Sequence, residues 1–152
     1  MLELARECDW EAVQRLSVQV HDLHVAWRPD IFYSCDAPYP KEFFLEDMAN
    51  RLVYVAKLQD QVVGYVVLSM EVKGGHGTAQ KRVLSIDSIC VDEAFRRQGI
   101  GRQMLADVRA LARAFRCREV LLSVHPENDG AVVFYQKCGF RIRTIKMDMP
   151  LS

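Results

Sequence analysis

The 152-residue chain carries 20 lysines and arginines against 20 aspartates and glutamates, so its formal net charge is zero. This balance provides no basic field of the kind that nucleic-acid binding needs, and no apolar run approaches the roughly 20 residues that cross a bilayer. Half of the residues are hydrophobic, which is enough for a packed core, and the length predicts one domain over residues 1–152.

The cysteine and histidine patterns bound the chemistry further. The five cysteines are scattered, with no C-x-x-C pair, and the four histidines are dispersed. This favours reduced thiols in a cytoplasmic protein over disulfides, and it predicts no metal site. The first ten residues, M-L-E-L-A-R-E-C-D-W, lack the pattern of a signal peptide.

The first third of the chain predicts a short strand over residues 2–5 and then a helix that Asp9 can cap. Hydrophobic residues recur in this helix at spacings of three and four, which gives one buried face: Trp10, Val13, Leu16, Val20 and Leu23. Residues 29–40 hold three of the five prolines and predict an irregular, aromatic-rich loop. A second helix is expected over residues 40–50.

The middle of the chain reads mainly as strands. Residues 52–58 and 62–72 predict an antiparallel hairpin, and the glycine-bearing residues 73–82 predict a flexible loop. A central strand over residues 83–91 is followed by the main helix, expected over residues 101–115.

The last third continues the alternation of strands and helices. Residues 119–124 contain the nearly continuous apolar run V-L-L-S-V, which suits an interior strand parallel to the central one. A further helix is expected to begin at Asn128 or Asp129 and to stop at Gly139. One or two strands over residues 140–150 complete the predicted elements.

The junction between the central strand and the main helix has the outline of an anion site. The first amides of a helix lack intrahelical partners, and glycines there leave room for a phosphate. Arginines surround the same point, so the expected ligand is a pyrophosphate. The run G-x-x-x-x-G-K-[ST] is absent, and the fingerprint G-x-G-x-x-G fails because position 104 is Met.

What remains is R-x-x-G-x-G at Arg96, Gly99 and Gly101, after a strand end at Val91 and Phe95. This motif resembles the signature of the GNAT superfamily of acyl-CoA-dependent N-acyltransferases. The run N-D-G-A-V-V-F-Y-Q-K-C-G-F at residues 128–140 is similar to a second pattern of that family, N-x-x-A-x-x-[FL]-Y-x-x-x-G-F. The order of the predicted elements also matches.

The resemblance implies an α/β fold, a single GNAT domain whose mixed, twisted β-sheet is flanked by helices and split around the acyl-CoA site. It further implies acetyl-CoA as cofactor, with its pyrophosphate on the amides of residues 98–102 and its pantetheine along the central strand. The residues expected to bind it are Ile89, Cys90, Val91, Arg96, Arg97, Gln98, Gly99, Ile100, Gly101, Arg102, Asn128 and Tyr135.

The resemblance assigns catalytic roles as well. Tyr135 is expected to protonate the departing thiolate, because a tyrosine hydroxyl with a pKa of about 10 can donate without prior ionisation. A backbone amide near a bulge around residues 89–91 is expected to polarise the thioester carbonyl. The general base stays open between Asp87, His125 and water, since relatives place a glutamate where this chain has Ser123.

Asp87 is the only acid in the central strand, and strict alternation would point its side chain away from the face that Ile86 and Ser88 share. The pocket for the acceptor is expected to be lined by Phe32, Tyr33, Tyr39, Asp87 and His125.

The implied function is acetyl transfer from acetyl-CoA to a primary amine of a small molecule. Direct attack in a ternary complex is favoured, because no Cys-His or Ser-His pair is evident. The alternatives are a protein N-terminal or lysine acetyltransferase, and a non-catalytic module that binds or senses acyl-CoA. The partners implied are a small-molecule amine or a peptide and a second copy of the chain, since the closing strands could form a homodimer. Neither nucleic acid nor a membrane is expected.

Overall fold

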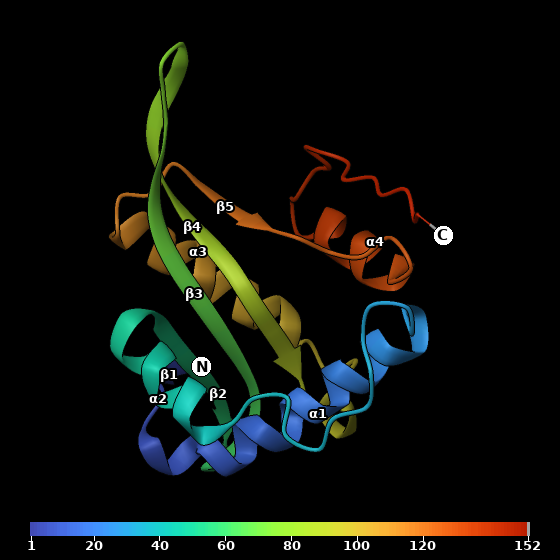
Figure 1. The fold of residues 1–152 in the computed structure, drawn as a ribbon. Helices are drawn as coiled ribbons and strands as arrows, with labels where there is room; N and C mark the ends of the chain where they lie inside the picture. Colours follow the sequence, from blue (N-terminus) through green and yellow to red (C-terminus); the bar gives the residue numbers. More distant parts are fainter. Residues whose placement is uncertain (152) are drawn as a thin grey trace.

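The computed structural model describes residues 1–151, and a five-stranded sheet lies at its centre (Figure 1). The first four strands pair antiparallel in chain order, and the fifth pairs parallel to the fourth. The strands are β1 (Leu2–Leu4), β2 (Leu52–Leu58), β3 (Gln61–Gly75), β4 (Thr78–Val91) and β5 (Glu119–Leu122). The sheet is therefore mixed, as predicted.

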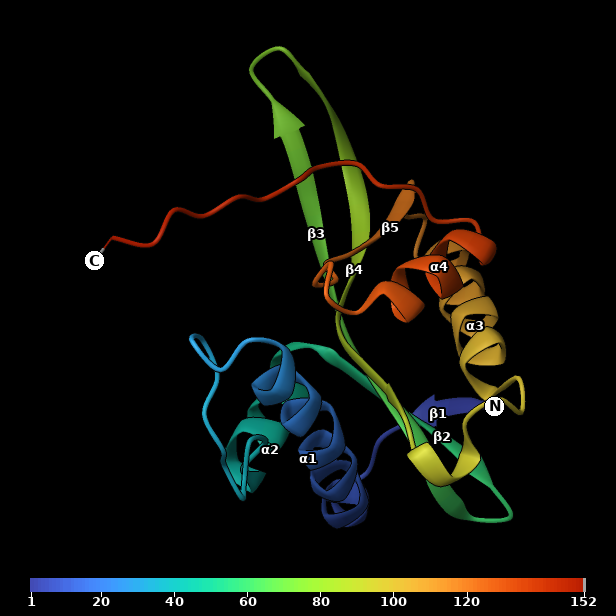
Figure 2. The same cartoon turned by 90° about the vertical axis from the view of Figure 1, so that its right-hand side faces the viewer.

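Helices cover both faces of the sheet (Figure 2). One face carries α1 (Trp10–Trp27) and α2 (Lys41–Asn50), and the other carries α3 (Ile100–Ala114) and α4 (Asp129–Lys137). Two short 3-10 turns, η1 (Glu7–Asp9) and η2 (Glu93–Phe95), precede α1 and α3. Within residues 1–151 no helix is both long enough and apolar enough to cross a membrane.

Strand β3 explains why two cores form. Its residues 62–68 are all buried, and their side chains divide between the two faces. Val63, Val66 and Leu68 join the core under α3, whereas Val62, Tyr65 and Val67 join the core under α1 and α2. A continuous apolar run is what a strand covered on both faces requires.

The loop predicted over residues 73–82 is instead the end of a long hairpin. Strands β3 and β4 stay paired as far as Gly75 and Thr78, and the hairpin extends beyond the helical layers (Figure 1). The two connecting residues, His76 and Gly77, have positive φ angles of 48° and 97°. A two-residue turn of this kind matches the twist of paired strands. Gly77 therefore belongs to the turn, and Gly74 and Gly75 belong to the end of β3.

The C-terminal part also differs from the prediction. No strand forms in residues 140–151, and β5 is an edge strand with no buried residue. The apolar run that predicted an interior strand does form β5, but no strand of the described chain pairs with its outer edge. Gly139 ends α4 as expected, with a φ of 99°.

Candidate active site

Strands β4 and β5 pair over only part of their length. The pairs run from Val83–Glu119 to Ile86–Leu122, and β4 then continues to Val91 without a partner on that side among residues 1–151. Figure 1 shows the two strands diverging. The backbone of residues 87–91 is therefore open to an extended ligand, which can pair with it as an added strand would.

A β-bulge marks the point where the strands separate. Val67 pairs with Ser88 but Leu68 pairs with Ile86, so Asp87 is an extra residue in β4. Asp87 and Ser88 consequently point to the same face, toward α1 and α2, where both line one pocket. The predicted alternation between them is wrong, because a bulge interrupts the two-residue period. The bulge also lies before the expected position at residues 89–91.

The start of α3 has the predicted form of an anion site. Gly99 is the N-cap with a φ of 81°, a conformation that favours glycine, and no side chain caps the helix. The first intrahelical bond runs from the Gln103 amide to the Gly99 carbonyl at 3.0 Å. The amides of residues 100–102 precede that bond and have no acceptor within the helix. Arg97 and Arg102 are exposed beside them.

Gly101 has a packing role in addition to the one predicted. A Cβ at this position would lie 3.3 Å from Cζ of Phe134 and 3.7 Å from a methyl group of Val91. Its missing side chain therefore lets α4 pack closely against the start of α3. A larger residue here would press against Phe134.

Tyr135 follows Phe134 on α4 and is half-buried against the core under α3. Its ring packs at 5.8 Å from that of Phe140. Burial raises the pKa of the Tyr135 hydroxyl, with smaller contributions from the Cys138 and Cys90 thiols. The hydroxyl is therefore protonated at neutral pH.

Asn128 has a structural role that the structure shows directly. Its Oδ1 accepts a hydrogen bond of 3.2 Å from the Ala131 amide, which caps α4. The side-chain amide nitrogen is not used by this cap and can still donate to a ligand.

On the opposite face, a pocket of about 260 Å³ lies between α1, α2 and the bulge of β4. Its polar lining is Ser17, His21, His24, Tyr39, Asp47, Arg51, Tyr65, Asp87 and Ser88. Tyr39 donates to Asp47 at 2.5 Å, and Ser88 donates to the Tyr65 hydroxyl at 3.2 Å. Burial raises the pKa of Tyr65 to about 12.

Within this pocket the Asp87 carboxylate already has two donors. Arg51 Nη1 donates to one oxygen at 3.0 Å and Ser69 Oγ to the other at 3.1 Å. Arg51 also lies 3.3 Å from Asp47. No local sequence pattern pointed to Arg51 or Tyr65, because their places here depend on how α2 and β3 pack.

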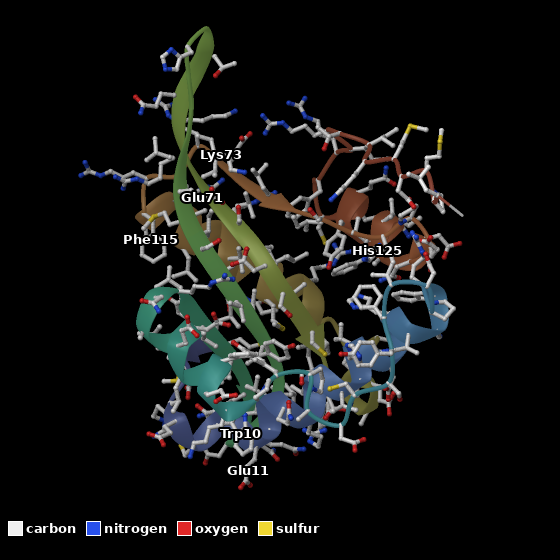
Figure 3. All side chains as sticks on the ribbon, in the orientation of Figure 1. Trp10, Glu11, Glu71, Lys73, Phe115 and His125 are labelled. Carbon is white, nitrogen blue, oxygen red and sulfur yellow. The ribbon has the colours of Figure 1, made fainter. Side chains whose placement is uncertain are left out.

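An aromatic and histidine cluster adjoins the pocket through His24, which is one of its lining residues. The His24 ring stacks on Phe32 at 5.0 Å and lies 5.5 Å from His125, which itself lies 5.8 Å from Phe32. Burial lowers the pKa of His24, and charge on His125 and His21 lowers it further, so His24 is neutral. Figure 3 shows His125 where the end of α1 and the loop after it approach the β5–α4 connection.

Of the predicted acceptor residues, Tyr39 and Asp87 line this pocket, whereas Phe32 and His125 lie beside it, in contact with His24. Tyr33 is placed differently. Its side chain is 80% exposed, and its contact with this region is a backbone carbonyl that accepts from His21 at 2.7 Å.

Comparisons with known proteins agree with this geometry. Residues 17–140 match the model of the acetyltransferase (GNAT) family. N-alpha-acetyltransferases from Sulfurisphaera tokodaii and Sulfolobus acidocaldarius are 32% and 35% identical over 68% of this chain and 65% of theirs. A glucosamine 6-phosphate N-acetyltransferase from Trypanosoma brucei brucei is 27% identical over 70% of this chain and 73% of its own. The chain therefore aligns with just under two thirds of the length of each archaeal relative.

Two solved structures define the likeness of the fold. A mutant of the BH1408 protein from Bacillus halodurans superposes with a TM-score of 0.95 and 29% identity over 100% of this chain and 99% of its own. An aminoglycoside N-acetyltransferase in complex with CoA superposes with a TM-score of 0.69 and 19% identity over 99% of this chain and 100% of its own. The match to the family model covers most of the chain, and the chain therefore belongs to the acetyltransferase (GNAT) family.

Proposed function

We propose that the protein transfers an acetyl group from acetyl-CoA to a primary amine by direct attack in a ternary complex. The observation that carries this proposal is the separation of β4 from β5 beyond Ile86 and Leu122. The exposed strand edge leads to the open amides of α3, and α4 brings Tyr135 to the same region. Acetyl transfer from acetyl-CoA uses three such features: a strand edge for the pantetheine, an anion site for the pyrophosphate and a proton donor for the departing thiolate.

The residues present fit acetyl-CoA. The amides of residues 98–102, together with Arg97 and Arg102, would hold its pyrophosphate, because uncapped helix amides and arginines favour anions. The backbone of residues 89–91 would hold the pantetheine amides, and Asn128 can add a donor from its free side-chain nitrogen. When bound there, acetyl-CoA supplies an acetyl group already activated as a thioester.

Tyr135 is the proposed general acid. Its raised pKa keeps a proton on the hydroxyl at neutral pH, and its ring packs against the same core cluster as Ile89 and Val91 of β4. A neutral donor in a half-buried site can protonate a departing thiolate in the same step in which the carbon–sulfur bond breaks. The phenol is regenerated from the proton that the attacking amine loses.

Asp87 is the proposed group that takes or relays that proton. It faces the pocket at the bulge, directly beside the open strand edge. Arg51 and Ser69 fix the orientation of the carboxylate. His125 and water are the alternative proton acceptors, and His125 contacts His24, which lines the pocket. The pH dependence described in the Discussion separates these routes.

The acceptor is proposed to be a small-molecule primary amine, held in the pocket beside Asp87. A peptide α-amine is the second candidate, because the archaeal relatives are named N-alpha-acetyltransferases. All five cysteines are free, which supports the expected cytoplasmic setting.

The test is thiol release from acetyl-CoA with a panel of amines: a polyamine, an amino sugar phosphate, a peptide with a free α-amine, and the same peptide blocked at its N-terminus but carrying a lysine. We expect the largest kcat/KM with a small amine. A larger value for the free peptide would select the second candidate. Tight binding of acetyl-CoA without amine-dependent release from any acceptor would identify a binding module and overturn the enzymatic proposal.

A further inference from the structure

The charges of the chain are unevenly distributed, although they sum to zero. Residues 70–82, 113–119 and 141–143 together contain eight lysines and arginines but only two acids, Glu71 and Glu119, which gives a net charge of +6. The rest of the chain contains the other twelve lysines and arginines and eighteen acids, which gives −6. Charge that gathers in one part of a protein creates a local potential even when the net charge is zero.

Two of these segments meet through Arg82, near the end of the β3–β4 hairpin. The Arg82 guanidinium donates to the carbonyl oxygen of Phe115, at the end of α3, at 3.0 Å. The Arg82 carbonyl oxygen accepts from the Arg118 amide at 2.8 Å. The hairpin therefore lies against the turn that joins α3 to β5 (Figure 1).

The first residue of β5 joins the third segment to the other two. Glu119 accepts from Arg143 at 2.6 Å and lies 3.0 Å from Lys81. The cations of the three segments therefore form one surface, at the end of β4 opposite to the open edge at residues 87–91. This basic surface consists of Lys73, Lys81, Arg82, Arg113, Arg116, Arg118, Arg141 and Arg143.

Most charges of the basic surface are available to a partner. Seven of its eight residues are exposed, and Lys81 is partly exposed. Glu119 pairs with Lys81 and Arg143, and Glu71 lies 4.0 Å from Lys73. The members that form no salt bridge with any of residues 1–151 are Arg82, Arg113, Arg116, Arg118 and Arg141.

Two exposed apolar side chains lie beside these cations. Met70 is 46% exposed and Val72 is 58% exposed, and both belong to the hairpin. Val72 pairs with Arg82, and Met70, two residues away, lies on the same face of the hairpin. Met70 itself pairs with Leu84, which is buried in the core under α3. The apolar face of this core therefore continues into solvent along the hairpin, where a partner can bury it.

We propose that the basic surface, together with Met70 and Val72, binds an acidic segment of another protein. Six of the eight cations are arginines, and a guanidinium can bind a carboxylate through two parallel hydrogen bonds. Arginine and methionine are also enriched where proteins meet. The hairpin projects beyond the helical layers, so a partner reaches it without covering the proposed acetyl-transfer site (Figure 2). This interaction is independent of the proposed activity.

A polypeptide suits this surface better than a nucleic acid does. A phosphodiester backbone can pair with the arginines, but it has no apolar side chain to cover Met70 and Val72. The rest of the chain carries a net charge of −6, which repels a polyanion that extends beyond the basic surface. A short acidic segment with interspersed apolar residues supplies both kinds of contact and stays within the surface.

The test is fluorescence anisotropy with a short labelled peptide of alternating glutamate and leucine. We expect the parent to bind it at an ionic strength of about 0.15 M and to bind it more weakly as salt is added. Arg118→Glu/Arg141→Glu reverses two exposed, unpaired charges and should lower the affinity by about tenfold or more. The control Arg6→Glu/Lys41→Glu makes the same change of charge at exposed positions near α1 and α2, and should alter the affinity by less than about twofold.

A second pair of measurements tests the apolar contacts. Met70→Ser/Val72→Ser leaves every charge in place and should still weaken the peptide, and a peptide with serine in place of leucine should bind the parent more weakly. Circular dichroism must show that each variant is folded.

Three results would overturn the proposal. The first is a parent that does not bind the peptide, and the second is an equal effect of the charge reversals in Arg118→Glu/Arg141→Glu and in the control. The third is tighter binding of a single-stranded RNA oligonucleotide than of the peptide, which would identify the surface as one for nucleic acid.

Discussion

Gly101 and Phe134 meet at the start of α3, where a Cβ on Gly101 would lie 3.3 Å from Cζ of Phe134. This contact holds α4 against the helix start that is proposed to receive the pyrophosphate. Because Tyr135 follows Phe134, the same contact also fixes the position of the proposed proton donor. The anion site and the donor are therefore coupled through van der Waals packing.

Gly101→Val should weaken both features together. The added side chain must displace Phe134, and overpacking of this kind costs about 1–3 kcal/mol. We expect a lower Tm and a weaker affinity for acetyl-CoA in calorimetric titration. Gly130→Val is the matched control, since a Cβ on Gly130 meets no atom within 4 Å. Loss of affinity with an unchanged Tm would mean that the side chain blocks the ligand directly and leaves the α3–α4 packing unchanged.

A buried acid, Asp92, follows the end of β4 and ties the connection between β4 and α3 to helix α1. Asp92 is only 4% exposed at its side chain, and it accepts from Arg15 at 2.7 Å, from the Ala94 amide at 3.1 Å and from Gln19 at 3.2 Å. Burial by itself raises the pKa of Asp92, but these donors outweigh it and the net pKa is lowered.

Arg15→Met should destabilise the protein by about 1–3 kcal/mol at pH 7, the cost of leaving a buried acceptor short of a partner. Because the folded pKa of Asp92 lies below its unfolded value of 3.8, its stabilisation is complete above that value and is lost as the pH falls through the folded pKa. Urea unfolding from pH 7 to pH 2 should show this loss in the parent and a flatter profile in Arg15→Met. Arg113→Met, at an exposed position of α3, is the control. Equal profiles in all three proteins would exclude this role of Asp92.

Asp87→Asn tests the proton acceptor. If Asp87 takes the amine proton, the rate should fall on the order of 10²-fold where the amine is charged, and the defect should shrink toward the pKa of the amine, about 10.4 for a lysine-type amine. The measurement is kcat/KM against pH with the best acceptor.

Arg51→Met separates base chemistry from orientation, because it keeps the carboxylate and removes the guanidinium that holds it at 3.0 Å. A base should retain its pH-dependent activity in this variant. If Asp87 only orients the acceptor, the variants Asp87→Asn and Arg51→Met should lose activity equally, and the loss should be the same at every pH.

The order of the first nine predicted helices and strands, from residue 2 to residue 138, was predictable because apolar spacing and glycine positions are local signals. The bulge at Asp87 was not, because the run S-I-D-S-I-C suits either regular or bulged pairing. Its place is fixed by the pairs that Ile86 and Ser88 make with β3. Such long-range pairing leaves no mark in a single strand.

The candidate site shows the same division. The glycine-bearing start of α3 and the polar start of α4 are local motifs. The sequence predicted α3 from residue 101, one residue later than observed, and α4 from Asn128 or Asp129, of which Asn128 is the cap. The cluster of His24, Phe32 and His125 joins segments about a hundred residues apart, so only packing could reveal it. The closing strands were predicted from their alternation, but a strand also needs a neighbour, and none is present in the described chain.

Tyr135→Phe addresses the central claim that the open edge of β4 is an acetyl-transfer site with Tyr135 as its acid. The change removes one hydroxyl and keeps the ring that packs against Phe140. Affinity for acetyl-CoA and Tm should therefore stay near those of the parent. General acid catalysis typically contributes 10²–10⁴-fold, and the loss should appear in kcat, because the donor acts as the bond breaks.

The decisive measurement is the single-turnover rate of acetyl transfer to the best amine, with enzyme in excess over acetyl-CoA, for the parent and for Tyr135→Phe. Single turnover removes product release from the observed rate. The proposed mechanism predicts a fall of about 10²-fold or more at unchanged affinity for acetyl-CoA. Equal rates in the two proteins would contradict it and would make Tyr135 a packing residue of α4.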